Sequence, residues 1–310
     1  MTLLVLAILT PLVPIVTVAL FSRSGGAGRL VWYLDFVTAA SVITIFYVIG
    51  TWVFVSYYLR YAVAITFLIV SFVRFLVIRH QSLVPSRHTA SRTTLLVRIA
   101  AAVITLWLAV LVYAGHAPPA GTLDLSFPLR DGSYCIIQGG RNFVTNPFHN
   151  FVDSEHAVDI VKINRAGNRA DGISPRDRSA YHIYDEPVYS PHDGIVVTVV
   201  DTIEDNVPPR ANAISPLGNH VIVAFDNVRV IVAHLRKGST VVDVGQPVKR
   251  DDLIGRVGNS GYSNEPHLHV QVLRDGGADG DGGVGSTGNV VPVPIRFDGR
   301  YVAINDIVRR

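Results

Sequence analysis

The 310-residue sequence contains a single cysteine, Cys135. One cysteine excludes an intramolecular disulfide, so a domain outside the cytoplasm would have to be held by its hydrophobic core or by a metal. Lysine is also scarce, because only Lys162, Lys237 and Lys249 occur. None of them stands in a motif suited to carrying a covalently attached biotinyl or lipoyl group, which argues against a carrier protein.

Acidic residues are almost absent from the first 115 positions. Asp35 is the only acid there, against eight arginines, whereas the remainder holds 19 basic and 23 acidic residues. The net charge of +3 for the whole chain therefore conceals a basic first part and a mildly acidic second part. A mildly acidic domain lacks the positive field that phosphate backbones require, so the sequence predicts no nucleic-acid partner.

Long apolar runs are present only in the first part. Four of them come close to the roughly 20 residues that cross a bilayer as a helix. They cover about residues 2–21, 31–57, 61–78 and 96–114. The first run lacks a basic beginning and a small-residue cleavage site, so we expect it to be retained as a helix. Residues 1–114 are therefore predicted to be a transmembrane region with about four helices.

The arginines predict how this region is oriented. Loops 22–30 and 79–95 contain two and three arginines, whereas loop 58–60 contains one. Basic loops favour the cytoplasmic side, so the first two loops are predicted to be cytoplasmic and the fourth helix to lead outward. We therefore expect a multi-pass protein of the cytoplasmic (inner) membrane with a periplasmic, extracytoplasmic C-terminal domain.

The second part has the pattern of an all-β domain. Residues 115–124 are rich in proline and glycine and are expected to be a linker, followed by a domain over residues 125–310. Gly276–Gly288 is expected to be a flexible loop. The β-branched runs predicted to be strands are Val158–Ile163, Val188–Tyr189, Ile195–Val200, His220–Phe225, Val228–Ala233 and His267–Leu273.

Histidines and one aspartate stand out in these strands. His267 and His269 are two residues apart after a Gly-rich turn, so their imidazoles are expected on one face of a strand. Such a pair suits zinc binding by one ring and proton transfer by the other, although two structural histidines would give the same spacing. Asp159 is a lone carboxylate in an apolar strand, and His234 closes another hydrophobic strand. Buried carboxylates are usually paired or metal-bound.

This order of residues resembles the lysostaphin/LytM-type zinc metallopeptidases, which are peptidoglycan endopeptidases. The resemblance rests on Ala157–Ile160, on Ala-His-Leu at 233–235 and on the Gly-rich turn into His-Leu-His at 267–269, and it extends from about Gln138 to the C-terminus. It implies a mainly antiparallel LytM-like fold, a duplicated hybrid motif, and a Zn²⁺ cofactor. It further implies that Asp159 and His269 are zinc ligands and that His234 and His267 are catalytic.

The first zinc ligand departs from the family pattern His-x-x-x-Asp. The residue four before Asp159 is Glu155, and His156 stands three before it. An odd separation on a regular strand sends two side chains to opposite faces, so His156 would need a bulge to take part. His149 could reach the metal from a loop, as in a subset of the family. We favour His149, with His156 as the alternative.

The sequence thus predicts a membrane-anchored zinc metalloendopeptidase that hydrolyses peptide bonds of peptidoglycan with a zinc-activated water. The membrane and a peptidoglycan peptide are the expected partners, and no particular protein activator is indicated. The alternative is a catalytically inactive LytM-like module that binds or regulates in the cell envelope, which the absence of the His-x-x-x-Asp motif favours.

Overall fold

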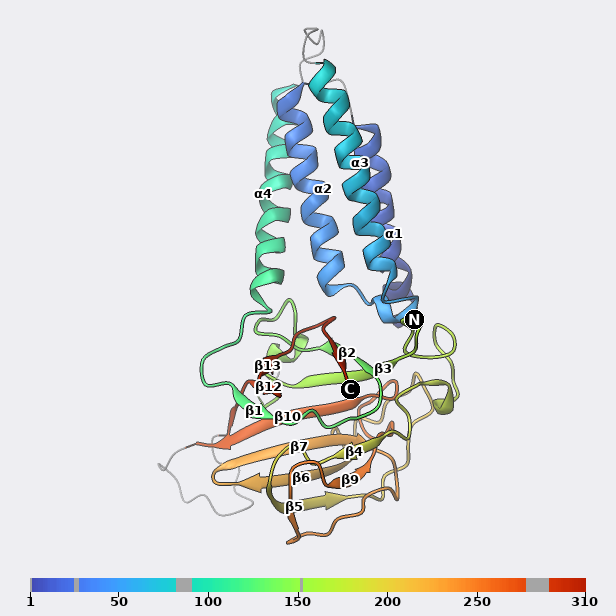
Figure 1. The fold of residues 1–310 in the computed structure, drawn as a ribbon, viewed down its shortest axis with the longest axis vertical. Helices are drawn as coiled ribbons and strands as arrows, with labels where there is room; N and C mark the ends of the chain where they lie inside the picture. Colours follow the sequence, from blue (N-terminus) through green and yellow to red (C-terminus); the bar gives the residue numbers. More distant parts are fainter. Residues whose placement is uncertain (1, 25–27, 82–90, 151–152, 277–289) are drawn as a thin grey trace. The chain divides into compact units, whose positions relative to one another are not determined.

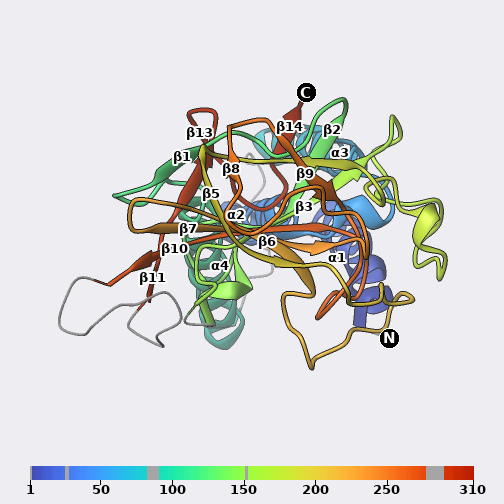
Figure 2. The same ribbon diagram turned by 90° about the horizontal axis from the view of Figure 1, so that it is seen from below.

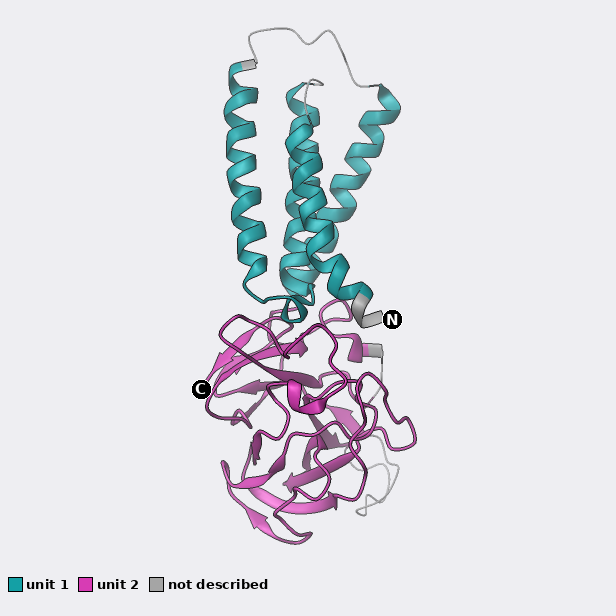
Figure 3. Ribbon diagram, turned by 90° about the vertical axis from the view of Figure 1, so that its right-hand side faces the viewer, with its two compact units in different colours: residues 1–114 teal, residues 115–310 magenta. Residues whose placement is uncertain are grey.

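The computed structural model describes residues 2–24, 28–81, 91–150, 153–276 and 290–310. The chain divides into two compact units, Met1–Ala114 and Gly115–Arg310, coloured separately in Figure 3. The expected loop at 276–288 lies outside the described residues except for Gly276, and so does the centre of the loop at 79–95. Each unit is described below by itself.

The first unit consists of helices. In the described part of the chain, four of them are long and apolar enough to cross a membrane, as judged by length and composition. The helices, visible in Figure 1, are α1 (Thr2–Arg23), α2 (Arg29–Ile49), the short η1 (Trp52–Phe54), α3 (Leu59–Gln81) and α4 (Arg92–Ala114). The prediction of four apolar helices is confirmed.

The apolar stretch at 31–57 does not form one continuous helix, contrary to expectation. Helix α2 ends at Ile49, because Gly50 adopts an extended backbone with φ −63° and ψ 144°. A Cβ at position 50 would lie 2.5 Å from the Phe46 carbonyl oxygen and 2.9 Å from Thr10, so glycine permits this close turn. Hydropathy alone does not distinguish a helix from an apolar turn packed against its neighbours.

Two kinds of contact hold the helices together. Aromatic rings pack in the core of the unit, where Phe21 lies 6.2 Å from Trp32 and 5.7 Å from Phe67 between ring centroids. Asp35 of α2 forms an ion pair with Arg98 of α4. The one acid of the apolar part is thus paired with a base from another helix, as expected for a charge that membrane helices must neutralise.

The second unit is built from short strands. In chain order they are β1 (Leu123–Leu125), β2 (Ser133–Gln138), β3 (Val158–Ile163), β4 (Pro187–Tyr189), β5 (Gly194–Val200), β6 (Asn219–Phe225), β7 (Val228–Leu235), β8 (Pro247–Val248), β9 (Leu253–Arg256), β10 (Leu268–Asp275), β11 (Val290–Pro292), β12 (Ile295–Phe297), β13 (Arg300–Tyr301) and β14 (Ile307–Arg309). Two 3-10 turns, η2 (Pro147–Asn150) and η3 (Arg178–Ala180), lie between them.

The largest sheet runs in the order β14-β2-β3-β10-β7-β6-β5-β8, and its neighbours are antiparallel. Figure 1 shows β10, β7, β6 and β5 as successive strands, and β11 pairs with the end of β10 (Figure 2). The pair β1–β12 is parallel. The prediction of a mainly antiparallel β domain is confirmed. Strand β1 starts at Leu123, within the stretch 115–124 expected to be a linker.

Burial follows position in the sheet. Strands β7 and β10 lie at its centre and are buried on both faces over most of their length. Strand β6 alternates at first between buried and half-buried residues, as expected where one face is partly exposed. The hydrophobic core collects valine and isoleucine from β3, β6, β7 and β10. Strands β3, β7 and β10 of this sheet carry Asp159, His234 and His269.

Candidate metal centre

Asp159 and His269 face each other across two neighbouring strands. Strand β3 pairs antiparallel with β10, and the register places His269 directly opposite Asp159. His269 Nδ1 lies 2.8 Å from Asp159 Oδ1, and because a carboxylate only accepts, the ring donates this hydrogen bond. Both side chains are buried, with 2% of Asp159 and 4% of His269 exposed. Two residues 110 positions apart in the chain therefore form one polar centre in an apolar sheet.

Three imidazoles surround the Asp159 carboxylate. Burial alone would raise the pKa of Asp159, but the neighbouring imidazoles of His267, His269 and His234 outweigh it and hold that pKa below its ordinary value. The carboxylate therefore stays ionised in an environment that would otherwise favour the neutral acid. A buried anion enclosed by imidazoles is a site where a cation is stabilised.

His269 has an acceptor at each ring nitrogen. Its Nδ1 faces Asp159, and its Nε2 lies 2.9 Å from Gln271 Oε1. Burial would lower the pKa of His269, but the bonds to Asp159 and Gln271 and the charge of Asp159 raise it above its ordinary value. Gln271 keeps its oxygen toward the ring because its amide lies 3.5 Å from the Asp153 carbonyl oxygen. Gln271 thus accepts from Nε2–H, and a metal at Nδ1 would take the place of the proton that Nδ1 donates to Asp159.

His234 reaches the centre through a β-bulge. Strand β6 pairs Asn219 with Leu235 and His220 with Ala233, so His234 is the extra residue on β7. Its φ is +63°, a left-handed conformation that costs energy for a residue with a Cβ. In a regular strand His234 would point away from the face shared by Ala233 and His269. The bulge places its ring centroid 5.6 Å from that of His269.

The environment of His234 keeps its ring neutral. Burial, followed by the neighbouring rings of His267 and His269, lowers the pKa of His234 well below its ordinary value. Its Nδ1 donates to the Ser260 carbonyl oxygen at 2.9 Å. The proton of the neutral ring is therefore on Nδ1, and Nε2 carries a lone pair.

His267 precedes β10 and turns its ring toward Asp159. Its Nε2 lies 3.6 Å from Asp159 Oδ2, and its ring centroid lies 4.7 Å from that of His234. Its Nδ1 donates to the Glu265 carbonyl oxygen at 2.8 Å. Because a carbonyl only accepts, this bond fixes the proton of the neutral ring on Nδ1, and Nε2 is bare. His267 and His234 thus present the same tautomer from two different parts of the chain.

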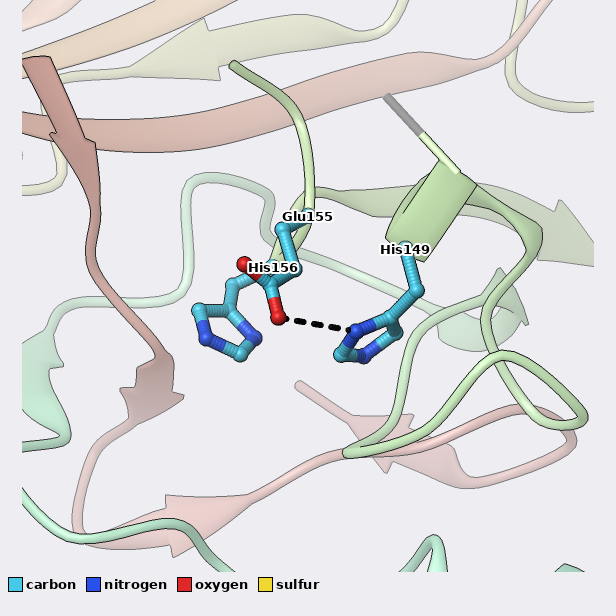
Figure 4. A group of neighbouring side chains, drawn as sticks. All are labelled: His149, Glu155 and His156. Atoms are coloured by element: carbon cyan, nitrogen blue, oxygen red, sulfur yellow. Dashed lines mark hydrogen bonds and ion pairs between the residues drawn. The ribbon is translucent and has the colours of Figure 1, made fainter. Parts of the chain in front are cut away.

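His149, Glu155 and His156 form a second group (Figure 4). One ligand atom from each lies within 4.8 Å of the others, which is close enough for a metal ion. His149 comes from η2, whereas Glu155 and His156 precede β3. His149 Nδ1 lies 3.1 Å from Glu155 Oε1, and its Nε2 lies 3.2 Å from the Gly140 carbonyl oxygen. Burial, opposed by Glu155, lowers the pKa of His156.

A ring contact links the neighbourhood of this group to the Asp159 centre. The ring of Phe148, next to His149 in the chain, packs edge-on against His269 with 5.3 Å between centroids. Glu155 holds His149 through Nδ1, as carboxylates orient metal-binding histidines in many proteins. The Nε2 of His149 is bonded only to a backbone carbonyl among the described contacts, so it is the atom that could be released to a metal.

The structure therefore brings together four of the residues singled out by the sequence, namely Asp159, His234, His267 and His269. It places His149 and His156 in the neighbouring group, in contact with each other and with Glu155. Sequence reasoning missed Gln271. It stands two residues after His269, and the same period of two that pointed to His269 places it on the same face of β10.

The donor set fits zinc. Imidazole nitrogen and carboxylate oxygen are common ligands of Zn²⁺, and the ionised Asp159 carboxylate opposite His269 could supply two of them. The other imidazoles at the centre, His234 and His267, bind backbone carbonyls through Nδ1. A third ligand would come from His149 or His156.

One family model and one curated protein each match part of this chain. Residues 180–279 match the model of peptidase family M23. A protein described as an uncharacterized metalloprotease from Buchnera aphidicola subsp. Baizongia pistaciae (strain Bp) is 35% identical over 88 residues, which are 27% of this chain and 23% of that protein. The chain thus spans less than a quarter of this curated relative's length.

Solved structures with low overall similarity include two peptidases. The catalytic domain of lysostaphin from Staphylococcus simulans is 21% identical with a TM-score of 0.25, covering 41% of this chain and 74% of that one. A zinc-containing peptidase from Vibrio cholerae is 24% identical with a TM-score of 0.23, covering 38% and 46%. The family match includes His234, His267 and His269, and Asp159 precedes it. Residues 180–279 of this chain therefore form a domain of peptidase family M23.

Proposed function

We propose that the protein is a membrane-anchored zinc metalloendopeptidase that hydrolyses peptide bonds of bacterial peptidoglycan. The observation that carries this proposal is the buried, ionised Asp159 enclosed by His234, His267 and His269. Buried charges are usually paired or coordinate a metal, and the match to a peptidase family supports a metal at this site. The similar protein from Buchnera aphidicola is likewise described as a metalloprotease.

The chain's own residues divide the chemistry between them. Asp159 Oδ1, His269 Nδ1 and His149 Nε2 would hold the metal, which when bound activates a water molecule and polarises the scissile carbonyl. His267 and His234 each use the Nδ1 proton on a backbone carbonyl, so each can accept a proton at Nε2. The imidazolium formed in this way can donate to the negative oxygen or to the leaving amine.

Removing the metal is expected to abolish hydrolysis. The full-length protein in detergent would be incubated with cross-linked muropeptides before and after treatment with a chelator, and the products identified by mass spectrometry. New fragments before treatment, their loss afterwards and their return on adding zinc are the expected results, because the metal activates the attacking water. Unchanged cleavage after complete zinc removal would contradict the metal's role.

Replacing His149 by alanine is expected to lower zinc affinity more than roughly 100-fold. Loss of a residue that only hydrogen-bonds to a metal ligand costs roughly 10–100-fold, and here the ligand itself is lost. The His156→Ala variant is the matched control and is expected to bind zinc nearly as the wild type does. Competition with a chromophoric chelator measures both affinities. The reverse ranking would assign the third ligand to His156.

The helices support a membrane anchor. By the arginine content of the loops, residues 22–30 and 79–95 would be cytoplasmic, and the peptidase unit would lie outside the cytoplasmic membrane, where peptidoglycan is found. Labelling of a cysteine introduced at an exposed position such as Tyr262 by a membrane-impermeant reagent tests this orientation in cells.

A binding module without turnover is the second candidate. It is favoured by one observation: His149 contacts Gly140 and Glu155 rather than Asp159 or His269. Zinc content distinguishes the peptidase from the binding module, because the module would retain no stoichiometric zinc even after purification in the presence of zinc. One bound zinc together with muropeptide cleavage would exclude the module.

A further inference from the structure

The backbone of His267 lies just before the strand pairing of β10. Strand β10 begins at Leu268, and the pairing with β3 also begins there, so the backbone of His267 lies outside the ladder. The direction of its ring depends on the hydrogen bonds of Nδ1, which lies 2.8 Å from the Glu265 carbonyl oxygen and 3.2 Å from Ser263 Oγ. The position of the Glu265 backbone therefore determines which nitrogen of His267 faces Asp159.

The side chain of Glu265 is held by a buried arginine. Arg169 Nε lies 2.8 Å from Oε2 and an Arg169 terminal nitrogen lies 2.7 Å from Oε1, which is a bidentate pair. Only 2% of Arg169 is exposed. Tyr181 adds its hydroxyl at 3.2 Å from Oε1. Every described partner of the Glu265 carboxylate thus comes from the segment between β3 and β4.

That segment is itself fixed. Arg169 donates to the Ile173 carbonyl oxygen at 2.9 Å, and its own carbonyl accepts from His182 N–H at 3.0 Å. Ala170 and Tyr181 form an isolated antiparallel bridge. Burying an ion pair removes two charges from water and is seldom the most stable way to fill a core, so its retention favours a role in fixing one geometry.

We propose that Arg169 and Glu265 are positioning residues for His267. Their bidentate pair, supported by Tyr181, holds the Glu265 carbonyl where it fixes the His267 proton on Nδ1 and leaves Nε2 bare toward Asp159. This inference rests on the proposed function for its catalytic consequence, although the effect on the tautomer does not. Lysine at position 169 could not replace arginine, because an ammonium lacks the planar fork that engages both oxygens.

The test uses the full-length protein in detergent micelles, with ¹⁵N-labelled histidine. Two-bond ¹H–¹⁵N spectra distinguish protonated from bare ring nitrogens, and the His267 signals are assigned by their loss in the His267→Ala variant. The variants are Arg169→Lys, which keeps the charge, and Glu265→Gln, which keeps the shape. Lys162→Gln is the matched control, because it breaks the half-buried Lys162–Glu186 pair (2.7 Å) elsewhere in the unit.

In the wild type and the control, we expect His267 to show the Nδ1–H tautomer alone. In Arg169→Lys and Glu265→Gln we expect a mixture of tautomers and a kcat for muropeptide cleavage about tenfold lower, with KM and zinc content nearly unchanged. A single Nδ1–H tautomer in both variants would overturn the proposal, and if one variant does not fold, the other decides. If the wild type cleaves nothing, the proposed function fails, and the spectra still decide whether Arg169 and Glu265 position His267.

Discussion

Replacing His267 by alanine is expected to lower the kcat for peptide hydrolysis about 10²–10⁴-fold, the usual contribution of a general acid–base group. The reason is geometric. His267 Nε2 is bare and lies 3.6 Å from Asp159 Oδ2, so its ring borders the site where a water held with Asp159 would react. The zinc content of the variant is expected to stay at the wild-type level, because Asp159 and His269 bind each other without help from His267.

Two measurements check this expectation, namely the initial rate of muropeptide cleavage and the zinc content by elemental mass spectrometry. His192→Ala is a matched control, because it removes an imidazole stacked on Phe225 at 3.7 Å, in contact with none of the residues of the metal centre among its described partners. The control is expected to cleave at the wild-type rate. Loss of zinc from His267→Ala would instead make His267 a ligand.

The central strands can be predicted from the sequence because their residues carry a local signal. The β-branched pattern predicts Val158–Ile163 with the bounds that β3 has in the structure, and it predicts the end of β7 two residues early. Strands of two or three residues are mostly missed. Strand β1 forms only by pairing with β12, about 170 positions later, so nothing within it marks it as a strand.

The arrangement of side chains around Asp159 can be predicted only in part from the sequence. The spacing of His267 and His269 indicates a shared face, and the structure adds the register that sets His269 opposite Asp159. The approach of His234 cannot be foreseen, because alternation would point it away and only the bulge with φ +63° reverses it. A residue that violates local preference at a candidate site is where tertiary contacts override the sequence signal.

The loop that carries His149 gives the least information in the sequence. Spacing excludes a simple His-x-x-x-Asp arrangement and leaves His149 and His156 as candidates. The structure places both beside Glu155, and the contact of Phe148 with His269 shows that the loop borders the Asp159 centre.

A glycine contact supports the position of His234. The carbonyl of Ser260 accepts the His234 Nδ1–H, and the next residue, Gly261, has φ +76°. A Cβ at Gly261 would collide with the backbone of Gly218 and lie 2.7 Å from the Ser215 carbonyl oxygen. The two chain segments meet here at a distance that only glycine allows, and the backbone atoms involved cannot move aside as a side chain could.

Gly261→Ala is therefore expected to destabilise the protein far more than the matched variant Gly238→Ala. Gly238 has a similar φ of +69°, but a Cβ there would meet nothing within 4 Å. In the control, the free energy of unfolding should fall by about 1–2 kcal/mol because of the left-handed backbone alone. In Gly261→Ala it should fall by a further amount of about 1–3 kcal/mol because of overpacking. For a unit of this size each kcal/mol lowers the melting temperature by about 2–4 °C.

Thermal unfolding of the full-length variants in the same detergent, followed by circular dichroism in the β region, measures the difference. The displacement of Ser260 should also weaken the hydrogen bond that fixes the His234 tautomer, so Gly261→Ala is expected to lower kcat at temperatures where it remains folded, whereas Gly238→Ala should not. Equal losses of stability in the two variants would mean that the Gly218–Gly261 contact relaxes without cost, and the backbone would then not be what holds His234 in place.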